Sequence, residues 1–233
     1  INSGAFIVKN EEVFNAEIIF KIAPPTIEEI GKMRKHAIVF SIAFTRTQPE
    51  EYFHLLIKKK ITTIAYDNLR NKNGNLIIMD TLCKIIGNAC PLIAGEYFSL
   101  ANDGYIIGSF GGIPPAEIVF LGATKIAETA AKIFLSMDAS IKIFDCSLSR
   151  LNDIKQTLGH PVYTSTLYPE TLRNAITKAD LVIADSFYRT KDEYLIDEEL
   201  VKKKKKGSLI IDVGIAQGTK IETSRPTTLE HPF

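Results

Sequence analysis

The sequence has no tryptophan, only three cysteines and almost no excess of charge. Cys83, Cys90 and Cys146 form no C-x-x-C pair, and their odd number, without a secretory hydrophobic segment, favours reduced thiols in the cytoplasm. The 28 basic and 27 acidic side chains give no field that would collect nucleic acid or a membrane surface. Asn88 and Pro91 interrupt the longest apolar run before it reaches the roughly 20 residues that span a bilayer. We therefore expect a cytoplasmic protein with a small-molecule ligand.

Short runs of β-branched residues alternate with helical segments in the first half of the chain. The runs lie at residues 18–22, 38–43 and 61–66, and an earlier apolar stretch, residues 5–8, reads as an interior strand. Alternation of this kind predicts βαβ units and a parallel sheet. A long apolar segment at about residues 82–100 then predicts a helix that links two lobes.

A cluster of glycine and proline at residues 104–115 marks a boundary, and the clearest pattern follows it. Strands are expected at residues 118–121, 141–144, 162–164, 181–184 and 209–213, with a helix in each interval. The sequence therefore predicts an α/β protein with two Rossmann-like parallel-sheet domains, the second of them doubly wound. We place the boundary between the two domains after residue 112 and the end of the second domain at residue 220.

The turn after the first strand of the second domain has features of a dinucleotide-binding turn. Gly122 takes the tight-turn position, and Ala127 is a small residue where the helix would pack on the sheet. Thr124, however, stands where a second glycine would let phosphates approach, so the alternative of a plain strand-to-helix turn stays open. If the turn does bind a pyrophosphate, the cofactor-binding residues here are Gly122, Ala123, Thr124, Lys125 and Ile126.

Asp145 strengthens this interpretation because it ends the next strand, about 20 residues after the glycine turn. A carboxylate there can accept both ribose hydroxyls of NAD and would repel the 2′-phosphate of NADP. The alternative role is that of a turn or cap residue before Ser147. Further cofactor-binding candidates are Arg150, Ser186 and Val213.

Two other features carry little functional signal. The lysine run at residues 202–206 is interpreted as a solvated helix end, where cations favour the negative end of the dipole. The four histidines have no spacing suited to a metal site or a catalytic triad, so we expect no metal.

Several motifs resemble those of the alanine dehydrogenase family, which also includes the NAD-binding alpha subunit of the proton-pumping transhydrogenase. They are the stretch from Gly207 to Gly218, the segment from Glu222 to Thr228, and three earlier motifs at residues 20–25, 61–66 and 92–97. The resemblance covers nearly the whole chain. It implies a substrate domain at residues 1–112, a central NAD-binding domain at residues 113–220, a segment at residues 221–233 that returns toward the first domain, and an active site in the cleft between the two domains. It also implies that this chain lacks the family's opening strand and helix and a segment after Phe233.

In the reaction that the resemblance implies, pyruvate and ammonia form an imine that receives hydride from NADH. The family uses a lysine, a histidine and an aspartate, and these positions are occupied here by Ala23, Phe44 and Ala216. None of the three side chains can titrate, so the catalytic residues are unknown. Further departures are Leu82 to Lys84, the loop at residues 185–189, and Thr219 in place of a glycine.

Three functions remain open at this point. The first is an NAD-dependent alanine dehydrogenase or close amino-acid dehydrogenase, with full or impaired activity, that acts on a small substrate such as alanine or pyruvate. The second is a catalytically silent relative with a structural or nucleotide-sensing role. The third is a transhydrogenase alpha subunit, which alone among the three would require a membrane partner. The resemblance also implies a homo-oligomer.

Overall fold

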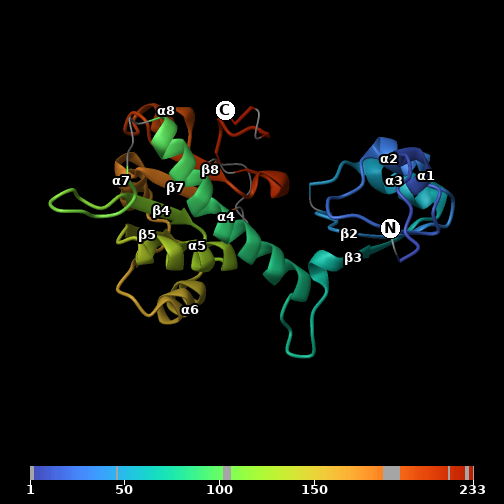
Figure 1. Cartoon of the computed structure of the whole chain (residues 1–233), viewed down its shortest axis with the longest axis horizontal. Coiled ribbons are helices and arrows are strands. Elements are labelled where there is room, and N and C mark those ends of the chain that lie inside the picture. The colour runs from blue at the N-terminus through green and yellow to red at the C-terminus, as the bar shows by residue number, and fades with distance from the viewer. Residues whose placement is uncertain are drawn as a thin grey trace. The chain divides into compact units, whose positions relative to one another are not determined.

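The computed structural model describes residues 3–45, 47–101, 106–185, 195–219, 221–228 and 231–232. The chain forms two compact units, Ile1–Thr81 and Leu82–Phe233 (Figure 1). The domain boundary expected between residues 112 and 113 therefore lies earlier in the chain. The reason is that the long helix α4 (Ile77–Ala101) packs Cys83, Cys90 and Phe98 into the core of the second unit.

The first unit contains a three-stranded parallel sheet in the order β1-β2-β3, as the alternating pattern predicted. Its elements are α1 (Asn10–Val13), β1 (Ile18–Phe20), α2 (Ile27–Lys32), β2 (Ile38–Ser41), α3 (Glu50–Lys59), β3 (Thr62–Ala65) and the 3-10 turn η1 (Tyr66–Asn68). The prediction of a strand at residues 5–8 is wrong. This stretch joins no described sheet, so Phe6 and Ile7 stay exposed.

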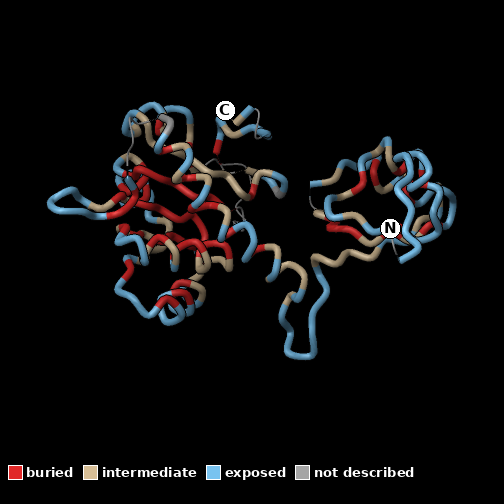
Figure 2. The backbone as a smooth tube through the Cα atoms, viewed as in Figure 1, coloured by how far each residue is buried: buried red, intermediate tan, exposed pale blue. Residues whose placement is uncertain are grey.

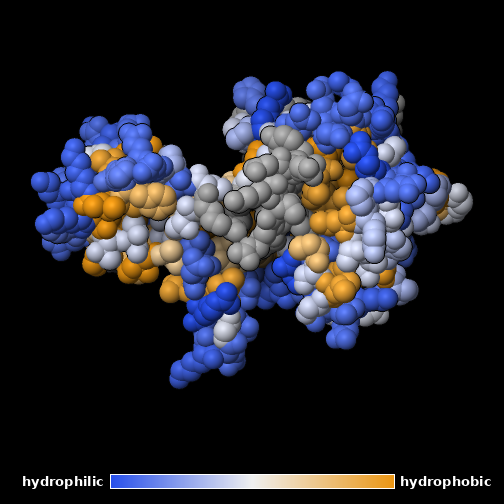
Figure 3. Space-filling view, turned by 180° about the vertical axis from the view of Figure 1, so that it is seen from behind, coloured by the Kyte–Doolittle hydropathy of each residue, from blue (hydrophilic) through white to orange (hydrophobic). Residues whose placement is uncertain are grey.

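The described helices of the first unit cover one side of this small sheet. Ile19 and Val39 point into a core closed by Ile30, Tyr52 and Leu56 of the neighbouring helices. The alternate positions of β1 face the other way, and Ile18 and Phe20 are 53% and 74% exposed. Figure 3 shows hydrophobic surface on this unit.

The second unit is a doubly wound parallel sheet, as predicted, with strand order β6-β5-β4-β7-β8. Its further elements are β4 (Glu117–Leu121), α5 (Lys125–Ser136), β5 (Ser140–Phe144), α6 (Leu148–Leu158), β6 (Tyr163–Ser165), α7 (Pro169–Lys178), β7 (Leu181–Ala184), α8 (Glu198–Lys202), β8 (Leu209–Asp212) and the 3-10 turn η2 (Ile215–Gln217). The chain winds outward from β4 on one side and resumes at β7 on the other. The strand order therefore reverses between β4 and β7, where open α/β sheets bind their ligands.

Both faces of the five-stranded sheet are buried (Figure 2). Ile118 and Phe120 of β4 face α4, α5 and α6, whereas Val119 and Leu121 face α7 and α8. This alternation on a central strand is what places helices on both sides. The resulting two-sided core holds the carboxyl ends of the strands in a fixed register.

Helix α4 differs from the sequence expectation about apolar runs. Its Ile77–Ser99 stretch is long and apolar enough to cross a membrane by length and composition alone. Asn88 and Pro91 lie within the helix and do not end it. One face of the helix, including Cys90 and Phe98, is buried in the core of the second unit, whereas Ile85 and Leu92 on the remaining surface are 60% and 75% exposed.

Two expectations about the end of the chain also change. The segment from residue 221 was expected to return toward the first domain, but Ile221 is buried in the second unit and bridges to Ile196. The lysine run is only partly solvated. Lys204 donates to the carbonyls of Ile176 and Ala179 at 3.1 Å each, and thereby caps α7. Burial lowers the pKa of Lys204 to about 8.

Candidate functional site: the carboxyl edge of the second sheet

The corner between β4 and α5 lies at the point where the strand order reverses. The amide of Gly122 donates to the carbonyl of Phe144 at 2.8 Å, and the amide of Asp185 donates to the carbonyl of Leu121 at 3.0 Å. These bonds tie the ends of β5 and β7 to the end of β4. The turn is thus held from both sides.

Gly122 has a backbone conformation that requires glycine. Its φ is +120°, which L side chains rarely adopt. A Cβ built there would lie 3.2 Å from Cγ2 of Thr124 and 3.3 Å from the carbonyl oxygen of Asp185. The predicted tight turn is therefore present, and a side chain at Gly122 would be strained by this φ and would require its neighbours to shift.

The first turn of α5 offers amide donors at this corner. Thr124 is the N-cap, and its Oγ1 accepts from the amide of Ala127 at 3.3 Å. The amides of Lys125 and Ile126 make no hydrogen bond within the described part of the chain, as expected for a first helical turn. Two such amides at the positive end of a 12-residue helix suit a phosphate group. This corner therefore fits a diphosphate.

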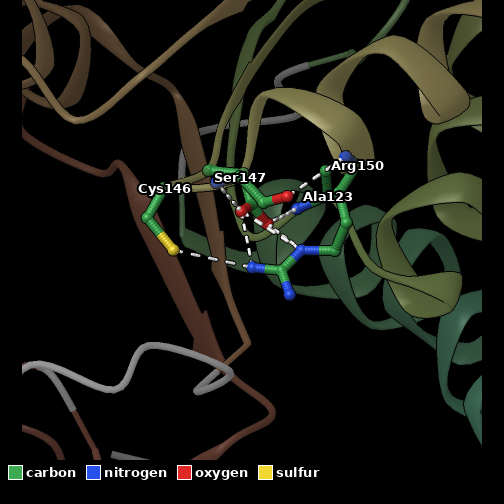
Figure 4. Close-up of polar contacts among 5 residues, drawn as sticks. Ala123, Cys146, Ser147 and Arg150 are labelled. Carbon is green, nitrogen blue, oxygen red and sulfur yellow. Dashed lines mark hydrogen bonds and ion pairs between the residues drawn. The ribbon is translucent and has the colours of Figure 1, made fainter.

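Asp145 has a different environment from the one expected. Its side chain is fully buried, and its oxygens accept from the amides of Ala123 (2.8 Å) and Ser147 (2.7 Å). Arg150 binds the same carboxylate through Nε (3.0 Å to Oδ2) and Nη2 (2.6 Å to Oδ1). Figure 4 shows these contacts, together with Sγ of Cys146 at 3.6 Å from Nη2 of Arg150.

These contacts correct two predictions. The amide of Ala123 was expected to point toward a phosphate, but it is used by Asp145. The carboxylate of Asp145 was expected to accept ribose hydroxyls, but four protein donors surround it and leave no surface for a ribose. The alternative weighed from the sequence, a turn residue before Ser147, describes what Asp145 does here. The ribose edge of the site therefore does not fit NAD in the expected manner.

The remaining predicted cofactor residues contribute unequally. Lys125 directs its ammonium to Glu128 at 2.7 Å, and Lys132 binds the same carboxylate. Burial would raise the pKa of Glu128, but the two lysines outweigh it and lower the pKa. Val213 is half-buried, and its amide donates to Ala184 at 2.9 Å, so it supplies only apolar surface at the end of β8. Ser186 lies outside the described residues.

A second carboxylate, Asp185, lies beside the glycine turn. It is buried at the end of β7, and its Cβ lies 3.6 Å from the position of a Cβ on Gly122. Burial raises the pKa of the Cys90 thiol to about 12, and the nearby charge of Asp185 adds to the shift. The sequence signal for Asp185 was its place directly after a buried strand, where Asp145 also stands. In the described ranges, no three His, Cys, Asp or Glu side chains gather as metal ligands.

A separate hollow of about 250 Å³ lies between β5, β6 and α7. It is lined by Lys142, Phe144, Tyr163, Thr171, Asn174, Ala175 and Lys178. No residue of the Gly122 turn lines it. It is therefore distinct from the corner described above.

Two positions that the resemblance implies for catalysis lie at the carboxyl edge of the first unit's sheet. Ala23 is exposed in the loop after β1, and the nearby Lys21 pairs with Glu29 at 3.2 Å. Phe44 follows β2 with φ +42°, in the left-handed region. Histidine is enriched there, whereas an aromatic such as phenylalanine is uncommon. The backbone at residue 44 thus suits the family's histidine better than the residue present.

The third implied position belongs to the second unit. Ala216 is exposed in η2, directly after β8. The neighbouring Asp212 is engaged by the amide of Gly214 at 3.1 Å and by the hydroxyl of Thr219. The side chains of Ala23, Phe44 and Ala216 hold no group that could transfer a proton.

Comparison with known proteins matches both halves of the chain to the same family. The model of the N-terminal domain of the Alanine dehydrogenase/PNT family matches residues 1–86, and that of the C-terminal domain matches residues 90–233. An alanine dehydrogenase from Methanococcus maripaludis is 31% identical over all of this chain. One from Bacillus subtilis is 28% identical over 99% of it. The chain spans 64% and 62% of these two relatives.

Solved structures show the same fold. An L-alanine dehydrogenase superposes with a TM-score of 0.79 at 24% identity, over 99% of this chain and 65% of that one. A transhydrogenase from Sinorhizobium meliloti superposes with a TM-score of 0.74 at 19% identity, over 97% of this chain and 68% of that one. With its two domain matches, the chain belongs to the Alanine dehydrogenase/PNT family.

Proposed function

We propose that this chain binds a nicotinamide dinucleotide at the Gly122 corner and lacks the proton-transfer chemistry of an alanine dehydrogenase. The observation that carries the first half is the Gly122 turn itself. It combines a glycine-only φ, a helix start with two amides directed at no described acceptor, and a place at the reversal of strand order. The relatives named alanine dehydrogenase support a nicotinamide dinucleotide over other diphosphates.

The role of each residue in binding follows from its geometry. The amides of Lys125 and Ile126 would donate to phosphate oxygens, and Gly122 would let the backbone approach them. The hydroxyl of Thr124 accepts from the amide of Ala127 and so stabilises the start of α5. Its methyl group would narrow the space through which a phosphate approaches the turn. The bound dinucleotide would supply hydride chemistry. The chain's own part is to bind and orient it.

The second half of the proposal rests on Ala23, Phe44 and Ala216. Well-placed acid-base groups contribute about 10² to 10⁴ each in rate. Because the residues present have no titratable groups, the chain could bind and orient the reactants but could not transfer protons through these positions. The fold of both units is intact around these positions, which supports retained folding without retained catalysis.

A turnover assay directly tests the proposal that the chain lacks proton-transfer chemistry. Purified protein with NADH, pyruvate and ammonia should oxidise no NADH above background. The variant Ala23→Lys/Phe44→His/Ala216→Asp should gain measurable turnover, with Phe44→His alone as a folding control. Turnover by the unchanged protein that Gly122→Ala abolishes would instead establish an active alanine dehydrogenase. Co-purification with a membrane subunit would instead favour the transhydrogenase alpha subunit.

We further propose a cytoplasmic homo-oligomer. The three cysteines are free, as expected in a reducing compartment. Parallel sheets are normally covered on both faces, whereas Ile18 and Phe20 of the first unit are exposed. Light scattering of the purified protein should give a mass that is a multiple of 25.9 kDa, and a monomer at micromolar concentration would contradict the assembly.

A further inference from the structure

The hollow between β5, β6 and α7 has the lining of a second binding site. Its volume is about 250 Å³, and it lies at the β6 edge of the five-stranded sheet. We propose that this hollow binds a small aromatic carboxylate. The proposal does not rest on dinucleotide binding, because the lining contains no residue of the Gly122 turn.

The sheet contributes a lysine to the hollow where this architecture normally has an apolar residue. β5 is an inner strand, paired with β4 on one side and β6 on the other. Inner strands of a parallel sheet are covered on both faces and are usually apolar throughout. Lys142 nevertheless lies on the same face of β5 as Phe144, which packs in the core with α7. Its side chain is 26% exposed and lines the hollow, so its ammonium is accessible to a ligand.

The charges around the hollow leave one positive charge unbalanced. Lys142 donates to Glu117 at 2.8 Å, so these two charges balance each other. Lys178 also lines the hollow, and no ion pair or hydrogen bond engages its ammonium in the part of the chain that the structure describes. The lining includes no aspartate or glutamate. A carboxylate carries one negative charge at neutral pH, whereas a phosphate monoester carries about 1.5 to 2, so a carboxylate matches this site better.

Helix α7 adds neutral hydrogen-bonding groups to the same wall of the hollow. Thr171, Asn174 and Lys178 have the spacing that places side chains on one side of a helix. All three residues are exposed, and no described residue binds the hydroxyl of Thr171 or the carboxamide of Asn174. Both groups can donate to a carboxylate oxygen. The hollow therefore offers donors of two kinds to one anionic group.

The apolar part of the lining is aromatic. The rings of Phe144 and Tyr163 are tilted by 54° with their centroids 6.1 Å apart. Phe144 is buried, whereas Tyr163 is 48% exposed and can pack against a ligand. A flat ring gains from offset or edge-to-face packing against such side chains. The volume is below the about 300–1,000 Å³ of sites for drug-sized molecules, which limits the ligand to about one ring.

The test is an NMR titration of the ¹⁵N-labelled chain with benzoate. We expect saturable shifts of the amides of Tyr163, Asn174 and Lys178, with a dissociation constant on the order of 1 mM for a ligand of this size. Benzamide has the same shape without the charge and should bind at least about tenfold more weakly. Acetate has the charge without the ring and should also bind at least about tenfold more weakly.

Variants separate the hollow from a general effect of charge. Lys178→Met removes the unbalanced charge at an exposed position and should weaken benzoate binding about three- to tenfold. The matched control is Lys155→Met. Lys155 is likewise exposed in the last turn of a helix, α6, but does not line the hollow, so its replacement should leave the affinity unchanged. Tyr163→Leu keeps an apolar side chain without the ring and should weaken binding at least about threefold.

Three results would overturn the proposal. Benzamide bound as tightly as benzoate would show that the hollow does not select an anion. Equal affinities of Lys178→Met and Lys155→Met for benzoate would show that Lys178 does not contact the ligand. A lack of saturable shifts at the three amides, at benzoate concentrations well above the expected dissociation constant, would show that the hollow is not a binding site.

Discussion

Replacing Gly122 by alanine is the perturbation whose effect the structure defines best. At φ +120° an L residue is strained by about 1–3 kcal/mol. The new Cβ would also lie 3.3 Å from a backbone carbonyl, that of Asp185, which cannot move without displacing the end of β7. We therefore expect Gly122→Ala to lower the free energy of unfolding by about 2–4 kcal/mol.

A second glycine provides the matched control. Gly159 ends α6 with φ +64°, and nothing lies within 4 Å of a Cβ built there. Gly159→Ala should cost about 1 kcal/mol, the usual penalty of a left-handed residue. Both variants reduce the entropy of the unfolded chain equally, so this contribution cancels in the comparison.

Urea unfolding followed by circular dichroism gives the two free energies, and dinucleotide titration gives the second readout. Gly122→Ala should be the less stable variant and should bind dinucleotide at least tenfold more weakly, whereas Gly159→Ala should bind normally. Equal stability of the two variants would contradict the strain expected for a side chain at Gly122. Full dinucleotide affinity of Gly122→Ala would show that the tight turn is not the phosphate site.

Three further predictions concern single positions. Gly87→Ala in α4 should destabilise the protein by about 1–3 kcal/mol, because its Cβ would lie 2.7 Å from that of Thr129. Gly95→Ala in the same helix meets nothing within 4 Å and should not destabilise it, as urea unfolding of both will show. Thr124→Gly should cost only a few tenths of a kcal/mol as a cap and should increase dinucleotide affinity in a titration; unchanged affinity would show that the methyl group of Thr124 does not narrow the site. Between pH 8 and 10.5 the native state releases the proton of Lys204 and the unfolded chain retains it, so stability relative to Lys204→Met should rise by about 3 kcal/mol; a flat difference across this range would contradict the burial of that amine.

The elements of the fold were largely predictable because their signals are local. Short β-branched runs marked all the strands that the two sheets contain among the described residues. Two helix caps also depend on neighbours a few residues away in the sequence: Thr26 forms a capping box with Glu29, and Ser147 accepts from the amide of Arg150. The stretch at residues 5–8 failed because a strand needs a partner, and hydrophobicity alone does not provide one.

The chemistry of the site was less predictable because it depends on side-chain direction. The sequence placed Asp145 at the end of a strand but did not indicate whether its carboxylate faces a ligand or an arginine five residues later. The lysine run gave a similar lesson, since charge predicts solvation and Lys204 instead reaches the carbonyls at the end of α7. Such choices are decided by which donors the fold brings within reach.

The most direct test of the account is an NMR titration of ¹⁵N-labelled protein with NADH. We expect the largest amide shifts at Lys125 and Ile126, whose N–H groups would donate to the diphosphate. Shifts confined to other places, such as the hollow beside Tyr163, or no shifts at millimolar NADH, would contradict a dinucleotide site at the Gly122 corner.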